Sequence, residues 1–371
     1  MDVYIKKKKI IFVIISLAGG GAEKVLIDIM NSLDPSRYEM DLVVFEKKGV
    51  YLSVLPAYVR VYDLHKKSRY DFPCLIIQLA ALLRQIKPDV VVSFLSYTNL
   101  VVVLAHLLSR GRTRIVIGEH GHLSTQLRRT RLKYLKRFLY GVFYNFSDTC
   151  IVPTDGIRED LIRSFHIKAD KIKNIYNPVD LARIRQLKNE SLGVHRVAPE
   201  KYILAVGRLT WEKGYTYLLK AYSLISPEIE EQLLFLGEGE ERKALAALTK
   251  DLGLEKKVIF AGFQNNPYKF MKNASLFVLS SVTESFALVI VEAMASGVVV
   301  VATDCPSGPA EIISDGVNGI LVPPADEKKL AEAMLRLLKD PALRNRLIEN
   351  GRKRAEFFGI PNILPSYEVL F

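Results

Sequence analysis

The chain alternates short runs of β-branched and aliphatic residues with longer segments whose apolar residues recur at helical spacing. The short runs are apolar on both faces, as parallel strands buried between helices require. In the first half the predicted strands are Ile10–Ser16, Met40–Phe45, Val59–Leu64, Val90–Leu95, Arg114–Glu119 and Thr149–Pro153. Alternating strands and helices predict an open parallel sheet covered by helices on both faces.

The same rhythm restarts in the second half. The predicted strands there are Tyr202–Val206, Leu233–Leu236, Val258–Phe260, Leu276–Leu279, Val298–Ala302 and Gly319–Val322. Between the halves, Pro178 has no N–H and biases Asn177 away from a helix, which marks a crossing between domains. We therefore predict an α/β protein with two Rossmann-like domains, 1–178 and 179–356, facing across a deep cleft. Chemistry is expected just beyond the carboxyl ends of the strands.

The charge of the chain is divided unevenly. Residues 1–178 hold 28 Lys and Arg against 16 Asp and Glu, whereas residues 179–371 hold 24 of each, so the first half carries the whole net charge of +12. The basic half indicates an anionic partner: nucleic acid, phospholipid headgroups or a phosphorylated substrate. The three cysteines are far apart, which excludes a CxxC site and fits a reducing compartment. No signal peptide is recognisable, so we expect a cytoplasmic protein.

Two candidate phosphate-binding loops follow predicted strands. Gly19, Gly20 and Gly21 come after the first strand and open a helix, whose N-terminal N–H groups suit an anion, although a tight turn would also use them. Arg208 and Lys213 leave the strand Tyr202–Val206 on one loop, a placement that suits a pyrophosphate. An ordinary solvated loop is the alternative for this second pair.

Glu284 and Glu292 flank seven mostly apolar residues. Ser285 is predicted to cap a helix over 286–296, which places Glu292 about two turns into that helix. A glutamate among Val, Ile, Ala and Met needs a polar partner when it is buried. The vicinal hydroxyls of a sugar or ribose fit, because one carboxylate accepts several hydrogen bonds. A helix with a capping acid and one salt bridge is the alternative.

Two features of the first half are further candidates. His120 follows the strand Arg114–Glu119 and is expected to reach the cleft, unless it is a core histidine. Gln126–Phe138 is predicted to be one amphipathic helix, either an interfacial or anion-binding surface or an ordinary helix that packs its leucines inward. Its expected membrane and acceptor surface consists of Arg128, Arg129, Lys133, Lys136 and Arg137.

Taken together, these motifs resemble the retaining glycosyltransferases of family 4, which have the GT-B fold. TESFALVIVEAMASG around Glu284 and Glu292 is similar to the E-x7-E signature of that family. Ala287 stands where the family often has glycine. The other matching segments, in the family's order, are GGGAEKV (19–25), EHGH (119–122), YNPVD (176–180), VGRLTWEKG (206–214), FLGEGEER (235–242) and DCPSGPAEIISDGVNGILVP (304–323).

The resemblance implies a role for each candidate residue. Arg208 and Lys213 would neutralise the donor diphosphate, and Glu292 would hold the ribose. Glu284 and His120 would touch the donor sugar. Backbone amides near Phe286, Ala287 and Leu288 would meet the distal phosphate, and Gly20 and Gly21 would close over the phosphates. The segment 357–371 would return to the amino-terminal domain.

The implied reaction transfers a hexose or N-acetylhexosamine, with retention, from a nucleotide diphosphate sugar, UDP by family frequency. The acceptor would be a saccharide or polyprenyl-linked saccharide at the anionic inner face of the cell membrane, where the protein would be peripherally associated. No metal or other cofactor is expected, because the chain has no Asp-x-Asp. The alternatives are a sugar-nucleotide epimerase of the same fold and a basic nucleic-acid-binding protein, although no nucleic-acid signature is present.

Overall fold

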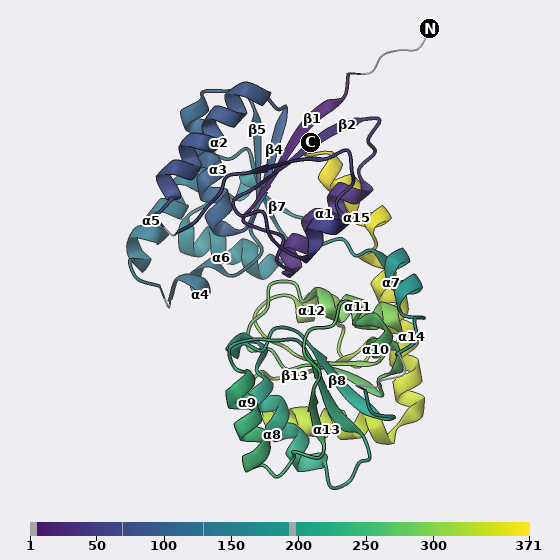
Figure 1. The fold of residues 1–371 in the computed structure, drawn as a ribbon. Helices are drawn as coiled ribbons and strands as arrows, with labels where there is room; N and C mark the ends of the chain where they lie inside the picture. The colour runs from purple at the N-terminus through teal and green to yellow at the C-terminus, as the bar shows by residue number, and fades with distance from the viewer. Residues whose placement is uncertain (1–5, 69, 129, 193–197) are drawn as a thin grey trace. The chain divides into compact units, whose positions relative to one another are not determined.

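The computed structural model describes residues 6–68, 70–128, 130–192 and 198–371. The chain divides into two compact units, shown in Figure 1. Unit 1 comprises Met1–Pro178 together with Ile360–Phe371, and unit 2 comprises Val179–Gly359. Each unit is a parallel sheet with helices on both faces, so the predicted α/β class with two Rossmann-like sheets is confirmed.

Unit 1 is built on a seven-stranded sheet in the order β3-β2-β1-β4-β5-β6-β7. Ile10 of the central β1 pairs with Met40 on one side and Val90 on the other, and all neighbouring strands run parallel. The strands are β1 (Lys8–Ile14), β2 (Tyr38–Val44), β3 (Arg60–Asp63), β4 (Val90–Phe94), β5 (Arg114–Gly118), β6 (Thr149–Val152) and β7 (Ile172–Asn174). All of them except the short β7 were predicted from the sequence.

The helices of unit 1 bury aliphatic faces against that sheet. They are α1 (Gly21–Ser32), α2 (Phe72–Ile86), α3 (Ser96–Ser109), α4 (Leu123–Arg128), α5 (Lys133–Phe143), α6 (Asp155–Phe165) and α15 (Ile360–Glu368), with 3-10 turns η1 (Val50–Val54), η2 (Tyr144–Phe146) and η3 (Ala169–Lys171). The last helix, α15, packs near β1 and β2, where Tyr38 Oη donates to Glu368 at 3.1 Å. Phe357–Gly359 belong to unit 2, so this segment of unit 1 begins three residues after the expected 357.

Unit 2 repeats the arrangement with six parallel strands in the order β10-β9-β8-β11-β12-β13. They are β8 (Tyr202–Val206), β9 (Gln232–Leu236), β10 (Val258–Phe260), β11 (Leu276–Leu279), β12 (Val300–Thr303) and β13 (Ile320–Val322). The helical elements are α7 (Leu181–Leu187), η4 (Trp211–Lys213), α8 (Tyr215–Ile225), α9 (Arg242–Asp251), α10 (Tyr268–Asn273), α11 (Leu288–Ser296), α12 (Pro309–Ile312), α13 (Glu327–Lys339) and α14 (Pro341–Phe357).

The strand orders locate the ligand-binding edge of each unit. In unit 1 the order reverses between β1 and β4, and in unit 2 it reverses between β8 and β11. The loops leaving two such strands diverge to opposite faces of the sheet, so a crevice opens at their carboxyl ends. The loops after β1, β4, β8 and β11 are therefore the places to look for chemistry.

The predicted single helix Gln126–Phe138 is wrong. The chain forms α4 up to Arg128 and starts again as α5 at Lys133. Thr130 bonds back to the carbonyl of Leu127 through both its N–H and its hydroxyl, each at 3.0 Å, which closes the turn that ends α4. Leu132 then adopts a left-handed backbone conformation with φ 60°, which prevents a continuous helix. Among the described residues, no helix is both long and apolar enough to cross a membrane.

Candidate functional site

The carboxyl edge of β8 and β11 in unit 2 brings two of the predicted residues together. Lys213 Nζ lies 2.5 Å from Glu284 Oε1. Both side chains are largely buried, with exposed fractions of 20% and 9%. Ser281, directly after β11, donates its hydroxyl to the same carboxylate oxygen at 2.7 Å. The loop after β8 and the loop after β11 thus meet in an ion pair supported by a hydroxyl.

Glycines allow these two loops to approach. Gly214 has φ +61°, and a Cβ there would lie 2.1 Å from the carbonyl oxygen of Ser280. A Cβ on Gly207 would lie 3.2 Å from Lys213 Cε, so the lysine stem passes over Gly207, next to Arg208. Arg208 itself is exposed and has no ion-pair partner among the described residues. One guanidinium is therefore open at this edge, while the neighbouring ammonium is paired.

The second glutamate of the signature is buried on α11. Glu292 is 8% exposed, and its Oε1 accepts a hydrogen bond from Tyr268 Oη at 3.2 Å. Tyr268 is the first residue of α10 and is itself buried, with its N–H held by Asn266 Oδ1 at 3.1 Å. The expected polar partner of Glu292 inside the protein is thus a tyrosine hydroxyl. We had not predicted it, because the short helix α10 gives no periodic signal in the sequence.

The turn before α11 differs from the prediction. Ser285 does not cap the helix; the capping position is Ala287, and the helix begins at Leu288. Ala287 has φ 59°, a left-handed conformation that glycine adopts more easily, which explains why glycine suits this position. Phe286 is buried against Phe358, with ring centroids 5.4 Å apart. The free amides of the first turn are therefore at Leu288 and beyond.

In unit 1, the glycine loop after β1 is already occupied by a carboxylate. The N–H groups of Gly19 and Gly20 donate to Glu23 Oε2 at 2.6 and 2.8 Å. Glu23 thus folds back onto the start of its own helix and engages the Gly20 amide, so the expected contact of Gly20 with a phosphate stays a prediction. Gly21 is the first residue of α1, and its amide belongs to the turn that helices leave without internal partners.

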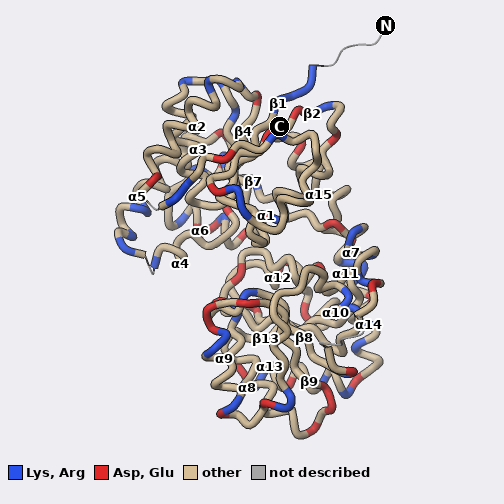
Figure 2. The backbone as a smooth tube through the Cα atoms, viewed as in Figure 1, with Lys and Arg blue, Asp and Glu red and all other residues tan. Residues whose placement is uncertain are grey.

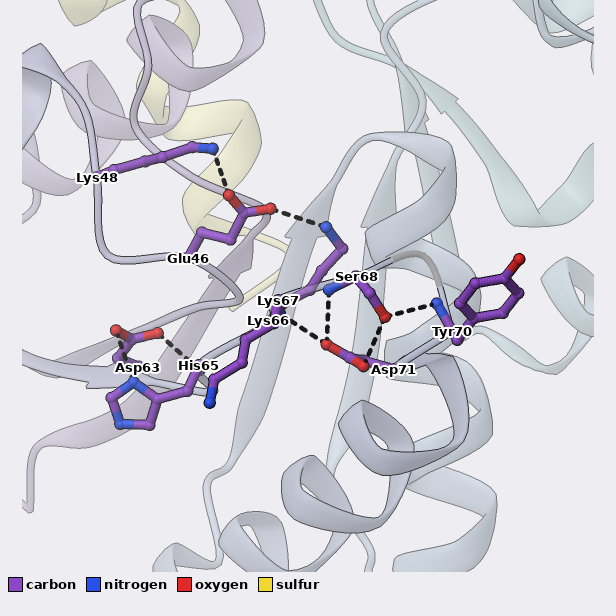
Figure 3. A network of polar contacts seen from close by, with 9 residues as sticks. All are labelled: Glu46, Lys48, Asp63, His65, Lys66, Lys67, Ser68, Tyr70 and Asp71. Carbon is purple, nitrogen blue, oxygen red and sulfur yellow. Dashed lines mark hydrogen bonds and ion pairs between the residues drawn. The ribbon is translucent and has the colours of Figure 1, made fainter.

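A network of polar contacts joins the loops that follow β2 and β3 (Figure 3). Glu46 pairs with Lys48 and, at 2.8 Å, with Lys66, which ties the loop after β2 to the loop after β3. Hydrogen bonds from these two lysines lower the pKa of the Glu46 carboxyl. The carbonyl of Lys48 accepts the N–H of Leu17 at 2.9 Å, so this network holds the chain that precedes the glycines.

His120 follows β5 and packs against Phe94 of β4, with ring centroids 4.4 Å apart and the ring planes tilted by 50°. Gly118 makes room for this pair, since a Cβ there would lie 2.4 Å from the Phe94 ring. Burial lowers the pKa of His120 to about 4, so the imidazole is neutral at neutral pH. Its Nε2 is buried and has no hydrogen-bond partner among the described residues. A neutral imidazole with an unused nitrogen can exchange a hydrogen bond with a substrate hydroxyl.

The α4–α5 segment (residues 123–143) exposes apolar side chains that were expected to face away from its basic residues. Leu132, Tyr134 and Phe138 are 70%, 76% and 66% exposed, and Leu135 is 52% exposed. We call these four residues the apolar ridge. The alternative of a helix that packs its leucines inward is thereby wrong, since Leu127 is buried whereas Leu132 and Leu135 are exposed.

Basic residues recur along the same segment as the apolar ridge, and the blue stretches of the backbone near α4 and α5 in Figure 2 mark their positions. Arg128, Lys133 and Arg137 are exposed, and Lys136 is partly buried. Arg137 donates to the carbonyl of Ser164 at 2.6 Å. Arg129, also predicted for this surface, lies outside the described residues. An apolar ridge flanked by cations is typical of a segment that lies in the headgroup region of an anionic bilayer.

Among the described residues, no group of three His, Cys, Asp or Glu side chains is arranged to hold a metal ion. Sequence reasoning also missed Ser281. Ser281 could have been found from the rule that functional residues lie just beyond the carboxyl ends of parallel strands, because Ser280 and Ser281 are the first two residues after β11. The predicted residues thus fall into a unit 2 cluster around Glu284 and a unit 1 group around His120 and the glycine loop.

Comparison with known proteins identifies the family of the chain. The family described as Glycosyltransferase Family 4 matches residues 19–183, and the family described as Glycosyl transferases group 1 matches residues 189–354. A relative from Campylobacter jejuni, N-acetylgalactosamine-N,N′-diacetylbacillosaminyl-diphospho-undecaprenol 4-alpha-N-acetylgalactosaminyltransferase, is 31% identical over 93% of this chain and 94% of its own length. The chain belongs to the family 4 glycosyltransferases and is an enzyme of the hexosyltransferase class.

Two further similarities extend over the whole chain. A second C. jejuni relative, GalNAc-alpha-(1->4)-GalNAc-alpha-(1->3)-diNAcBac-PP-undecaprenol alpha-1,4-N-acetyl-D-galactosaminyltransferase, is 28% identical over 96% of both chains. The crystal structure of Alr3699/HepE from Anabaena in complex with UDP-glucose has a TM-score of 0.80 and 25% identity, covering 98% of this chain and 99% of that one. The fold is thus GT-B, and neither the epimerase nor the nucleic-acid alternative gains support.

Proposed function

We propose that this glycosyltransferase takes an N-acetylhexosamine or hexose from a UDP-sugar and adds it to a saccharide carried on a polyprenyl diphosphate. The observation that carries the donor half is the cluster of Lys213, Glu284 and Ser281 at the β8–β11 edge, together with the buried carboxylate of Glu292 on α11. The acceptor half is supported by the two relatives whose names specify undecaprenol-linked saccharides.

In unit 2, each charged group has a proposed role. Arg208, exposed and without an ion pair, meets the diphosphate together with Lys213. When the phosphate takes the ammonium, Glu284 is released to accept hydroxyl hydrogens of the sugar. Glu292 holds the ribose hydroxyls while Tyr268 keeps its carboxylate oriented. The amides at the start of α11, from Leu288 on, meet the distal phosphate in place of those of Phe286 and Ala287.

In unit 1, we propose that His120 contacts the donor sugar and that the glycine loop meets the phosphates once Glu23 releases its amides. Transfer proceeds with retention, by attack of the acceptor hydroxyl on the anomeric carbon from the face that the leaving group vacates. The bond from that carbon to the phosphate oxygen breaks, and the acceptor proton passes to the departing phosphate. A double displacement would need an accessible carboxylate. Glu119, the acid beside His120, is 1% exposed and unsuited to attack.

The test of the donor site is a panel of nucleotide sugars measured by thermal shift, followed by kinetics of variants. We expect UDP-sugars to stabilise the protein and GDP-sugars not to do so. Arg208→Ala and Lys213→Ala should lower kcat by about 10²–10³-fold, as loss of a group that stabilises developing charge does. Lys250→Ala, on the outer helix α9, is the control and should behave as wild type. Wild-type kinetics in both site variants would refute the assignment.

The acceptor half has a separate test. Purified protein, a UDP-sugar selected by the panel and a polyprenyl diphosphate-linked disaccharide in anionic vesicles should give an elongated lipid-linked product. The same saccharide without its lipid should react more slowly. We propose that the α4–α5 segment brings the enzyme to the inner face of the membrane. Equal rates with both acceptors would show that the lipid is not recognised.

A further inference from the structure

Glu119 is a buried carboxylate that the proposed reaction leaves unused. It directly follows β5, and no lysine or arginine among the described residues forms an ion pair with it. Ser96 Oγ donates to its Oε1 at 2.9 Å, and Tyr144 Oη donates to its Oε2 at 2.8 Å. Two hydroxyl donors, one on each carboxylate oxygen, thus stand where a buried carboxylate ordinarily needs a cation.

The donors are themselves oriented by a second layer of hydrogen bonds. Asn99 on α3 donates to Tyr144 Oη at 3.2 Å and to the carbonyl of Gly118 at 2.9 Å. Its amide oxygen accepts from Ser93 Oγ of β4 at 2.8 Å. Because Asn99 donates to the tyrosine oxygen, the tyrosine proton is free to point at Glu119. The donated hydrogens therefore all point the same way, from Asn99 to Tyr144 and from Tyr144 to the ionised carboxylate of Glu119.

The hydrogen bonds around Glu119 hold the loop that carries His120. The loop starts at Glu119, whose carboxylate is held by Ser96 and Tyr144 and whose N–H donates to the carbonyl of Ile151 at 2.9 Å. It ends at α4, where Asp160 of α6 accepts the N–H of Ser124 at 3.0 Å. Between these two anchors, the His120 imidazole lies on the Phe94 ring with its Nε2 unpartnered. The backbone of His120 is fixed while its side chain keeps a nitrogen available.

We propose that Glu119, in its ionised form and oriented by Tyr144, is the positioning residue that sets the place of His120 for sugar transfer. The inference rests on the proposed role of His120 and adds a residue that acts through it. Glu119 touches no substrate in this account, because both of its oxygens are engaged inside the protein. A nucleophilic role is excluded by the same contacts and by its burial.

The network also makes the position of His120 depend on pH. Burial raises the pKa of Glu119 to about 7. The titratable groups that face it are Tyr140 of α5, Tyr144 of η2, Cys150 of β6 and Asp160 of α6, none of them a cation. Protonation removes the negative charge that the hydroxyls of Ser96 and Tyr144 are oriented toward, so both hydrogen bonds weaken and the loop is held less firmly. Turnover should therefore fall as the pH drops through about 7.

The test compares Glu119→Gln, Tyr144→Phe and wild type in pH profiles of donor hydrolysis, using the UDP-sugar that the wild type hydrolyses fastest. Glu119→Gln should lower kcat about 10²-fold, as a misplacement of about 1 Å can do, with KM little changed and no acid limb near pH 7. Tyr144→Phe removes one donor to the carboxylate and should move the acid limb to higher pH. Tyr38→Phe, which loses a hydroxyl contact to Glu368 in the same unit, is the matched control.

Hydrogen exchange gives a readout that needs no substrate. The amide of His120 should exchange faster in Glu119→Gln than in wild type, and Glu119→Asp should restore part of the protection. If Glu119→Gln does not fold, the shift of the acid limb in Tyr144→Phe decides the question. An unmoved limb, or wild-type kcat and exchange in Glu119→Gln, would overturn the proposal. Wild-type turnover in His120→Ala would instead refute the proposed function of His120, so the two failures are distinguishable.

Discussion

At the scale of single residues, the pairing of Lys213 with Glu284 explains how two charges are kept ready in a largely buried place. A buried charge that lacks a partner costs several kcal/mol in order-of-magnitude terms, and each of these groups supplies the partner of the other at 2.5 Å. Ser281 adds a donor that stays with Glu284 when the lysine turns to another anion. The ion pair therefore keeps a cation and an anion side by side, and each of them can exchange its partner for a group of the substrate.

The position of Lys213 depends on the residue that follows it. Gly214→Ala should destabilise unit 2 by roughly 2–4 kcal/mol, because a left-handed alanine costs about 1 kcal/mol and the contact with Ser280 adds an overpacking cost of about 1–3 kcal/mol. Binding of UDP should weaken as the loop moves. Denaturant unfolding and calorimetric titration with UDP measure both effects.

Gly253 offers a matched control for that substitution. It has φ +70°, and a Cβ there would meet nothing within 4 Å. Gly253→Ala should therefore cost about 1 kcal/mol, the left-handed penalty alone, and leave UDP binding unchanged. Equal losses of stability in the two variants would show that the close approach of Gly214 to β11 is unimportant.

A second prediction at this scale concerns Tyr268, whose hydroxyl donates to Glu292. Tyr268→Phe removes a hydrogen-bond donor to the buried carboxylate of Glu292. UDP affinity should therefore fall about tenfold, because a hydrogen bond to a charged group contributes about 1.4 kcal/mol. In Glu292→Gln, UDP affinity should fall further than in Tyr268→Phe. Tyr222→Phe is the control, because its hydroxyl binds the carbonyl of Glu231 at 2.8 Å, on the opposite end of the sheet. UDP affinity that survives in Tyr268→Phe would contradict this arrangement.

At the scale of elements, the strands were predictable because each is a continuous aliphatic run, and buried parallel strands need nothing else. β7 was missed because only Ile172 of its three residues is buried. The break between α4 and α5 was missed because it depends on the Thr130 contacts and on Leu132, whose conformation no periodicity reveals. In the site, charged residues after strands were found, whereas Tyr268, Ser281 and Tyr144 act through contacts that only the folded chain brings together.

The apolar ridge changes the expected mode of membrane attachment. Leu135→Ser with Phe138→Ser should reduce binding to anionic vesicles at least tenfold at any ionic strength, because burying such a side chain contributes about 1.5–3 kcal/mol. Arg128→Glu with Lys133→Glu should weaken binding mainly at low salt, since each cation contributes about 1 kcal/mol within a Debye length of roughly 8–10 Å. Vesicle co-sedimentation at two salt concentrations separates the two contributions.

Controls for both variants come from unit 2. Leu224→Ser alters an apolar residue of α8 that is likewise exposed, and Lys243→Glu with Lys250→Glu alters two cations of α9. None of these should affect vesicle binding. If the wild type does not bind anionic vesicles even at low salt, the membrane proposal is wrong and a water-soluble acceptor becomes the better account.

At the scale of the molecule, the sequence half with the excess charge is also the half that builds most of unit 1. Unit 2 is nearly neutral, with 24 Lys and Arg against 23 Asp and Glu, and places its two proposed phosphate-binding cations on one loop. A diphosphate met by Arg208, Lys213 and helix amides has its charge balanced without a metal ion. Transfer should therefore persist in excess EDTA. Complete loss of activity that Mg²⁺ or Mn²⁺ restores would refute this balance of charge.

The last prediction concerns α15, the segment from the far end of the chain that completes unit 1. Phe371 is 3% exposed, and its ring lies edge-on to the rings of Phe12 of β1 and Tyr38 of β2. The ring centroids are 6.1 Å and 6.3 Å apart, respectively. Its backbone carbonyl also accepts a hydrogen bond from Lys8. Phe371→Ala should therefore cost about 3 kcal/mol, as loss of a buried aromatic ring does.

The loss should be confined to unit 1. In hydrogen exchange, β1, β2 and α1 should lose protection, whereas β8 and β11 should keep theirs, because Ile360–Phe371 belong to unit 1. Phe357→Ala is the matched control, since this ring is 48% exposed at the end of α14 and its loss should cost about 1 kcal/mol or less. Equal loss of protection in both units would mean that they unfold as one, and the chain would then have to be treated as a single cooperative molecule.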